Sequence, residues 1–261
     1  MTGLQGLIFD VDGTLADTER DGHRVAFNRA FAEAGLDWDW TVELYAQLLS
    51  VTGGKERILF YLENYNTGFE RPVDLTGFIA GLHRDKTGHY MALMAEGAIP
   101  LRPGVRRLLE EARTAGVRLA IATTTTPENV EALIESALPK GAMDWFEVVG
   151  AGDIVPHKKP AADIYIWVLE KMRLQASQVI AFEDSAHGLT AARCAGIERV
   201  VVTVNDYTRA QDFSGALVVL ENFGEPGKPA RSLSGRAPSD GVVDLAFLRG
   251  LAGPAEATVL Q

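Results

Sequence analysis

Two carboxylates lie near the N-terminus, in the run Asp10-Val11-Asp12-Gly13-Thr14. Residues 7–9 just before them are apolar at every position, which is typical of a buried parallel strand. Carboxylates that directly follow such a strand project from the carboxyl edge of the sheet, where open α/β folds bind their ligands. Gly13 permits a sharp turn, and Thr14 adds a hydroxyl. An Asp-rich turn whose carboxylates cap a helix explains the same run, so by itself it leaves both interpretations open.

Three more polar groups follow predicted strands. Thr123 heads a run of threonines, Lys159 precedes Pro160 after a polar loop, and Glu183 and Asp184 form a second acidic pair. Each has an ordinary explanation as a capping residue or a solvated side chain. Together they would bring a carboxylate nucleophile, a hydroxyl, a cation and a further acidic pair to one edge of one sheet. That coincidence favours a catalytic site.

The elements that must position these groups alternate along the chain. Short apolar runs at 7–9, 119–122, 148–149, 179–182 and 200–202 predict buried strands. Between them, apolar residues recur with helical spacing, as at Val105, Leu108, Leu109 and Ala112, at Val130, Leu133, Ile134 and Ala137, and at Ile164, Trp167 and Val168. This alternation predicts an α/β fold, a doubly wound parallel sheet of Rossmann-like type.

One long stretch interrupts the alternation. Residues 17–98 are charged and helical in pattern, with an apolar stripe at Phe27, Ala30, Phe31 and Ala34 and no run typical of a buried strand. We therefore expect a core segment over 1–16, an inserted all-helical domain over 17–98 and a second core segment over 99–261. Within the second segment, 222–241 holds Gly, Pro or Ser at ten of twenty positions and predicts a loose connection, followed by a short terminal element that docks back.

Composition excludes several classes of protein. The 261 residues contain 25 Lys and Arg against 35 Asp and Glu, a formal charge of −10, which disfavours general binding to nucleic acid or anionic membranes. The single Cys194 excludes an internal disulfide and a cysteine-rich zinc module. No apolar window is long enough to cross a bilayer, and the first residues lack a basic region and a cleavage site. These features predict a cytoplasmic protein without nucleic-acid or membrane partners, and we expect a monomer rather than an oligomer.

The four polar groups, from Asp10 to Asp184, resemble the four motifs of the haloacid-dehalogenase-like (HAD) hydrolases, and the insertion after the first motif resembles the subfamily with a helical cap. Within it, the chain resembles the CbbY-type sugar-bisphosphate phosphatases over about residues 3–221. The strings that carry this are Thr18-Glu19-Arg20-Asp21-Gly22-His23-Arg24, Thr52-Gly53-Gly54-Lys55-Glu56-Arg57, Ala122-Thr123-Thr124-Thr125, and Gly152-Asp153-Ile154-Val155 leading into Lys158-Lys159-Pro160. The core motifs are specific for the superfamily, whereas the cap strings are less specific for the group.

The resemblance implies roles for the core residues. Asp10 would be the nucleophile that forms an aspartyl-phosphate, and Asp12 the general acid and base. Asp10, Asp184 and the main-chain carbonyl of Asp12 would hold Mg²⁺, with Glu183 as a further ligand or as a residue that orients the others. Thr123 would donate a hydrogen bond to the phosphoryl group and Lys159 would balance its charge, while Thr124 would contact the substrate.

The same resemblance implies that the inserted domain selects the substrate. The run Thr52, Gly53, Gly54 and Lys55, with Arg57, suits a second phosphate that is held and not cleaved. Glu19 and His23 would bind sugar hydroxyls, with Tyr45 and Arg102 as weaker candidates of the same kind. The alternatives are a helix N-terminal loop with solvated cations and an ordinary surface or core histidine.

The function implied is a Mg²⁺-dependent phosphatase acting on a small sugar bisphosphate such as xylulose 1,5-bisphosphate. The alternative is a sugar phosphomutase of the β-phosphoglucomutase kind, which shares the core motifs and the type of cap. A phospho-acceptor switch is disfavoured by Asp12 and the insertion, and a true dehalogenase would need neither Asp12 nor a metal.

Overall fold

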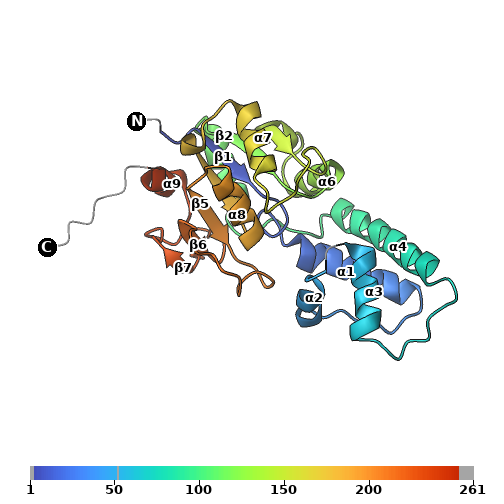
Figure 1. The fold of residues 1–261 in the computed structure, drawn as a ribbon. Coiled ribbons are helices and arrows are strands. Elements are labelled where there is room, and N and C mark those ends of the chain that lie inside the picture. The colour runs from blue at the N-terminus through green and yellow to red at the C-terminus, as the bar shows by residue number, and fades with distance from the viewer. Residues whose placement is uncertain (1–2, 52, 253–261) are drawn as a thin grey trace. The chain divides into compact units, whose positions relative to one another are not determined.

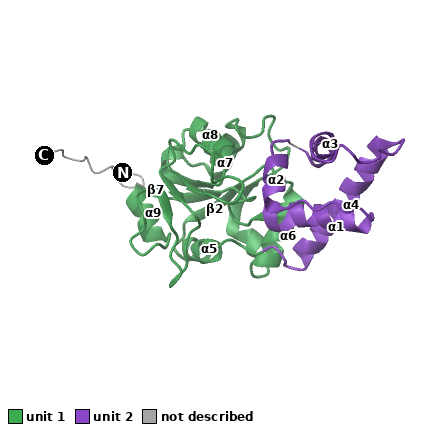
Figure 2. Cartoon of the chain, turned by 90° about the horizontal axis from the view of Figure 1, so that it is seen from below, with its two compact units in different colours: residues 1–17, 100–261 green, residues 18–99 purple. Residues whose placement is uncertain are grey.

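The computed structural model describes residues 3–51 and 53–252. The chain divides into two compact units, unit 1 with residues 1–17 and 100–261 and unit 2 with residues 18–99 (Figure 2). The sequence pattern places the corresponding divisions at 16/17 and 98/99. In the described part of the chain, no helix is long and apolar enough to cross a membrane.

Unit 1 is built on a single sheet in the order β3-β2-β1-β4-β5-β6-β7 (Figure 1). All neighbouring strands run parallel except β6 and β7, which are antiparallel. The predicted α/β fold with a mostly parallel, doubly wound sheet is therefore confirmed, and the five predicted apolar runs lie in its first five strands. The described strands are β1 (Gly6–Phe9), β2 (Arg118–Ala122), β3 (Phe146–Gly150), β4 (Val179–Glu183), β5 (Val200–Thr203), β6 (Val218–Leu220) and β7 (Ser232–Gly235).

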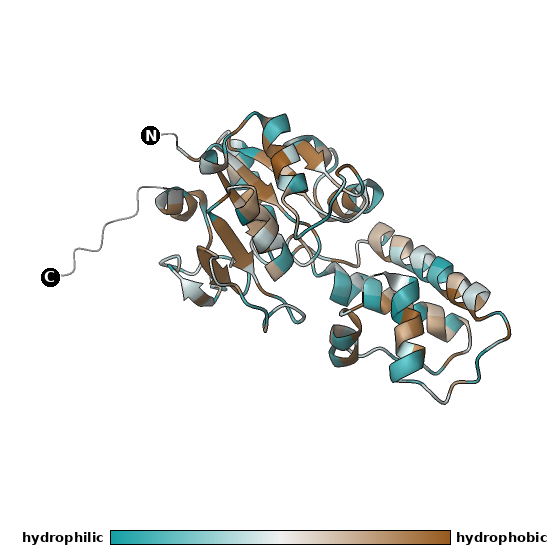
Figure 3. Cartoon of the chain, viewed as in Figure 1, coloured by the Kyte–Doolittle hydropathy of each residue, from teal (hydrophilic) through white to brown (hydrophobic). Residues whose placement is uncertain are grey.

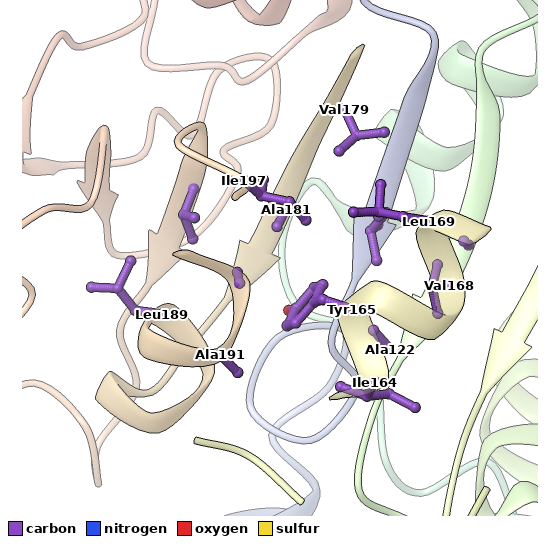
Figure 4. Close-up of a cluster of buried hydrophobic side chains, with 14 of the residues drawn as sticks. Ala122, Ile164, Tyr165, Val168, Leu169, Val179, Ala181, Leu189, Ala191 and Ile197 are labelled. Carbon is purple, nitrogen blue, oxygen red and sulfur yellow. The ribbon is translucent and has the colours of Figure 1, made fainter. Parts of the chain in front are cut away.

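Both faces of the central strands are buried, which is why the strands are apolar without alternation (Figure 3). Side chains such as Ile8 and Ala181 pack into a cluster with α7 and α8 (Figure 4). On the neighbouring positions, Phe9 and Phe182 stack at 4.5 Å between ring centroids, and Phe223 packs edge-on to both. The helices of unit 1 are α5 (Val105–Thr114), α6 (Pro127–Ala137), α7 (Asp163–Met172), α8 (Ala186–Cys194) and α9 (Leu245–Ala252), with short 3₁₀ turns at Ala142–Trp145 and Ala176–Gln178.

The C-terminal part is more ordered than its composition predicts. The stretch 222–241 is not a loose connection throughout, because it contains β7, which pairs with β6 at the edge of the sheet. Most side chains of β7 are exposed and two are serines, so the strand carries no apolar signal. The predicted terminal element is present as α9, whose Leu245 and Leu248 are buried.

Unit 2 consists of helices around an aromatic core. Its elements are the π-helix η1 (Thr18–His23), α1 (Arg24–Glu33), α2 (Val42–Leu48), α3 (Gly54–Asn64) and α4 (Leu75–Ala95). Trp40 contacts the rings of Phe27, Phe31, Tyr45 and Tyr61 at centroid distances of 4.6 to 5.9 Å. The predicted stripe is buried at Phe27, Ala30 and Phe31 but not at Ala34, because α1 ends at Glu33 and Ala34 is exposed beyond it.

Candidate active site

The carboxyl edge of the sheet brings the core candidates together. Phe9 of β1 is level with Ile121 of β2 and with Phe182 of β4. The residues that follow these strands therefore meet, since adjacent parallel strands lie about 5 Å apart. In this way the strand register alone places Asp10 beside the ends of β2 and β4.

Lys159 forms hydrogen bonds with three groups at this edge of the sheet. Its Nζ donates to Asp10 Oδ1 at 2.6 Å, to Glu183 Oε1 at 2.6 Å and to the carbonyl of Ala122 at 2.8 Å. Burial lowers the pKa of this ammonium, but the carboxylates of Asp10 and Glu183 raise it by more, so the pKa lies above its ordinary value. Lys158 differs, because its side chain is half exposed and pairs at the surface with Asp153.

Three buried carboxylates form a candidate metal site. Asp10, Glu183 and Asp184 each offer an oxygen, and these oxygens all lie within 4.8 Å of one another. Burial raises the pKa of the Asp184 carboxyl well above its ordinary value, and the charges of Asp10 and Glu183 raise it further. Burial also raises the pKa of Glu183, and the opposing effect of Lys159 does not cancel it.

A divalent cation fits this cluster. Lys159 pairs with Asp10 and Glu183, and Asp184 brings a third carboxylate to the same cluster, which leaves an excess of negative charge that a cation can balance. Glu183 Oε2 is buried and has no hydrogen-bond partner among the described residues. An all-oxygen donor set suits a hard cation such as Mg²⁺ or Ca²⁺ and does not distinguish between them.

Glu183 is held by a residue that sequence reasoning missed. The hydroxyl of Tyr165 donates to Glu183 Oε1 at 2.5 Å, and the ring lies among the apolar side chains of α7 (Figure 4). Gly188 of α8 closes the other side, since a Cβ there would lie 1.8 Å from Glu183 Oε2. Tyr165 gave no signal in the sequence, because an aromatic residue in an apolar helix is normally a core residue.

The loop after β1 passes directly against the acidic cluster. Gly13 has φ +85°, and a Cβ there would lie 2.3 Å from Asp184 Oδ2. Glycine is therefore required both for its backbone conformation and for space. Thr123 is buried after β2, and its Oγ1 accepts from the main-chain N–H of Thr125 at 3.2 Å, whereas Thr124 is exposed. Asp12 is partly buried.

Arg102 has a different role from the sugar contact suggested by sequence. Its guanidinium is buried and donates to the main-chain carbonyls of Gly13, Thr203, Val204 and Glu221. These carbonyls lie in the loop after β1, at the end of β5 and directly after β6. Arg102 thus ties three segments of the carboxyl edge to one another.

In unit 2, Glu19, Tyr45 and Arg57, all three named as candidates from the sequence, form a polar cluster. Tyr45 donates to Glu19 Oε2 at 2.7 Å, and Arg57 Nη1 donates to the Tyr45 oxygen at 2.7 Å. Burial raises the pKa of Glu19, but His23 in its protonated form, the charge of Arg57 and the hydrogen bond from Tyr45 lower it by more, so the net shift is downward. The carboxylate form of Glu19 is therefore favoured.

His23 belongs to the same cluster. Its Nδ1 lies 2.8 Å from Nζ of the buried Lys86, and its ring stacks on Tyr90 at 4.0 Å between centroids. An ammonium has only protons to donate, so Nδ1 is the acceptor and the neutral ring carries its proton on Nε2. Burial lowers the pKa of His23 to about 4; the positive charges of Lys86, Arg57 and His83 act in the same direction, against Glu19.

The glycine-rich run leads into α3. Gly53 precedes the helix with φ +94°, and α3 begins at Gly54. Lys55 is exposed, whereas Arg57 two residues later is buried against Tyr45, so the two cations lie in different environments. Thr52 lies outside the described residues.

Comparison with known proteins identifies the class. Residues 4–196 match the family model of the haloacid dehalogenase-like hydrolases, and the chain belongs to this family. It is 52% identical to Protein CbbY of Rhodobacter capsulatus over 213 residues, 82% of this chain and 91% of the relative. A crystal structure of a CbbY mutant from Rhodobacter sphaeroides in complex with xylulose-(1,5)bisphosphate is 46% identical, with a TM-score of 0.71, over 86% of this chain and 96% of that one. A putative beta-phosphoglucomutase from Thermotoga maritima is 28% identical, with a TM-score of 0.66, over 83% and 94%.

Substitution of Lys159 tests the central ion pairs. We expect Lys159→Met to lower the free energy of unfolding by about 3–5 kcal/mol, because it leaves buried carboxylates without their cation. Lys158→Met is the matched control, with a change below about 1 kcal/mol for an exposed pair. Urea unfolding of both variants measures the difference. Equal effects of the two substitutions would contradict the assignment of Lys159 as the buried partner.

The titration of His23 tests the cluster in unit 2. Between pH 6.5 and 4 the unfolded chain binds a proton at this residue and the folded chain does not, so stability is fully present above pH 6.5 and falls as the pH drops towards 4. Side-chain ¹⁵N NMR should show a neutral ring protonated on Nε2 at pH 6, with His23→Gln used to assign the signal. The same variant should lose part of the pH dependence of the thermal midpoint. An imidazolium at pH 6 would refute the arrangement.

Proposed function

We propose that this protein is a Mg²⁺-dependent phosphatase that removes one phosphate from a small sugar bisphosphate, with xylulose 1,5-bisphosphate as the substrate. The observation that carries the proposal is Asp10, buried in an acidic cluster with Asp184 and paired to Lys159 at 2.6 Å. The relatedness to CbbY, including a structure with that bisphosphate, supports the choice of substrate.

Asp10 is the nucleophile of the proposed reaction. A carboxylate oxygen of Asp10 bonds to phosphorus while the ester bond to the sugar oxygen breaks, which gives an aspartyl-phosphate. Lys159 fixes the position of Asp10, because its three hydrogen bonds join Asp10 to Glu183 and to the end of β2. Such fixed orientation supplies much of the rate in phosphoryl transfer.

Asp12 is the proton carrier. It donates a proton to the departing sugar oxygen and then accepts one from the water that hydrolyses the aspartyl-phosphate. Thr123 donates a hydrogen bond to a phosphoryl oxygen, and Thr124 contacts the substrate. Because Gly13 has no side chain, the loop that carries Asp12 can run against the acidic cluster.

Mg²⁺ is the cofactor of the proposal. Asp10, Asp184 and the main-chain carbonyl of Asp12 would hold it, and it would neutralise the negative charge of the phosphoryl group. Glu183 Oε1 already accepts from Lys159 and Tyr165, so its Oε2, which has no hydrogen-bond partner among the described residues, is the oxygen that would face the metal.

Unit 2 supplies selectivity in this proposal. Lys55 and Arg57, with Thr52 and the main chain of Gly53 and Gly54, hold the phosphate that is not cleaved. Glu19 and His23 bind sugar hydroxyls. The support is that Glu19 is a fixed carboxylate acceptor and His23 a fixed Nε2–H donor, a complementary pair for hydroxyl groups.

Turnover in ¹⁸O-labelled water tests hydrolysis against the mutase alternative. Xylulose 1,5-bisphosphate should yield the 5-phosphate and inorganic phosphate in equal amounts, with one labelled oxygen in each phosphate released. EDTA should abolish turnover and added Mg²⁺ should restore it, while Asp10→Asn should lower it by several orders of magnitude. Glucose 1-phosphate with a trace of the 1,6-bisphosphate is the control. Rapid formation of glucose 6-phosphate with negligible phosphate release would instead identify a mutase.

A comparison of bisphosphates with monophosphates tests the role of unit 2. Lys55→Ala should lower kcat/KM for the bisphosphate about ten- to a hundredfold and leave a monophosphate nearly unchanged, because one charge-assisted contact is lost. For Arg57 the substitution is to lysine and not to alanine, because Arg57→Lys keeps a cation in the buried position. Arg84→Ala, on an exposed arginine of α4, is the control and should change neither substrate. Equal losses on both classes of substrate would argue against binding of the second phosphate.

A further inference from the structure

Asn205 lies in the turn that follows β5, beside the acidic cluster. Its Nδ2 donates a hydrogen bond of 2.7 Å to Asp184 Oδ2. The motifs do not include this residue, and an asparagine in a polar loop is normally read as part of the turn.

The orientation of the Asn205 amide is determined by its other contacts. Its Oδ1 accepts from the main-chain N–H groups of Tyr207 at 2.9 Å and Thr208 at 3.2 Å. A flipped amide would point its NH₂ at these donors and its oxygen at the Asp184 carboxylate, which would break three hydrogen bonds at once. The NH₂ group must therefore face Asp184.

The turn itself is fixed to the sheet. The main-chain N–H of Asn205 donates to Thr208 Oγ1 at 3.1 Å, and the N–H of Val204 donates to the carbonyl of Leu220 at 2.9 Å. Arg102 donates to the carbonyls of Thr203 and Val204 and to that of Gly13. Arg102 therefore holds both the loop after β1 and the residues that directly precede Asn205.

Asn205, Asp184 and Gly13 are in close contact. A Cβ on Gly13 would lie 2.6 Å from Asn205 Nδ2 and 2.3 Å from Asp184 Oδ2. The amide therefore fills the space on one side of the Asp184 carboxylate, and rotation of that carboxylate would cost its bond to Asn205.

We propose that Asn205 is a positioning residue for the metal site: by holding one oxygen of Asp184, it sets the rotation of this carboxylate so that the other oxygen faces the bound cation. The inference rests on the proposed function, because it requires a metal-dependent enzyme. Groups that orient metal ligands typically contribute ten- to a hundredfold to metal affinity or activity.

Metal affinity of the whole protein is the primary test. Titration calorimetry with Mg²⁺, and electron paramagnetic resonance of free Mn²⁺, should give a Kd about ten- to a hundredfold weaker for Asn205→Ser than for the unsubstituted protein. Serine can still accept from the N–H groups of the turn but is too short to reach Asp184. Asn205→Ala, which also loses the turn contacts, should weaken binding at least as much.

Thr208→Val is the matched control. It removes the acceptor for the N–H of Asn205 from the same turn but leaves the donor to Asp184 in place, so metal affinity should change less than about threefold. At saturating Mg²⁺, Asn205→Ser should leave KM for the sugar phosphate unchanged while the Mg²⁺ concentration for half-maximal turnover rises. Urea midpoints of the metal-free proteins should agree between Asn205→Ser and Thr208→Val.

Two results would overturn the inference. Unchanged Mg²⁺ and Mn²⁺ affinity in Asn205→Ser would show that Asp184 is oriented without the amide. Equal weakening by Thr208→Val would show that only the fold of the turn matters. The proposed function fails separately, if the unsubstituted protein binds Mg²⁺ with the expected dependence on Asn205 yet releases no phosphate from any sugar bisphosphate.

Discussion

One buried ammonium among three buried carboxylates is the constraint on which unit 1 depends. Asp10, Glu183 and Asp184 repel one another in surroundings that exclude water, and Lys159 offsets only part of that repulsion. The hydrogen bonds that these carboxylates accept therefore stabilise the cluster. This explains why Lys159 makes three hydrogen bonds and why Tyr165 donates to Glu183 from a helix otherwise used for packing. The remaining negative charge is what makes the site suited to a cation.

The loops at the carboxyl edge are held by main-chain contacts for the same reason. A carboxylate that drifts by an ångström changes both its repulsion from its neighbours and its fit to a metal. Arg102 binds main-chain carbonyls of three segments at this edge, and Asn205, next to one of them, donates a hydrogen bond to Asp184. The apolar layers on both faces of the sheet supply the fixed frame, since side chains packed closely on both sides of a strand resist its displacement.

The parts of the site that lie directly after strands could be predicted from the sequence. Asp10, Thr123 and Glu183 each follow an apolar run, and parallel strands bring such positions to one edge whatever the loops do. Tyr165 and Lys86 could not be predicted, because their neighbours along the chain give no sign of the buried partner each one meets. The strand β7 was missed for a related reason: an edge strand with exposed serines has no periodic apolar pattern. Contacts between distant segments are therefore what the sequence pattern leaves out.

The chain leaves unit 1 and returns to it through two segments that lie side by side. Ala16 and Leu101 form an antiparallel bridge, the N–H of Arg102 donates to the carbonyl of Leu15 at 2.8 Å, and the Arg102 side chain pairs with Asp17 at 3.3 Å. The insertion of 82 residues therefore departs and returns at a single two-stranded stem. Since the ends of the stem are already joined on the unit 1 side, an inserted domain of another length or fold could be exchanged there without breaking a strand of the sheet. Under the proposed function, such a stem would allow the domain that selects the substrate to change while the acidic cluster of unit 1 stays the same.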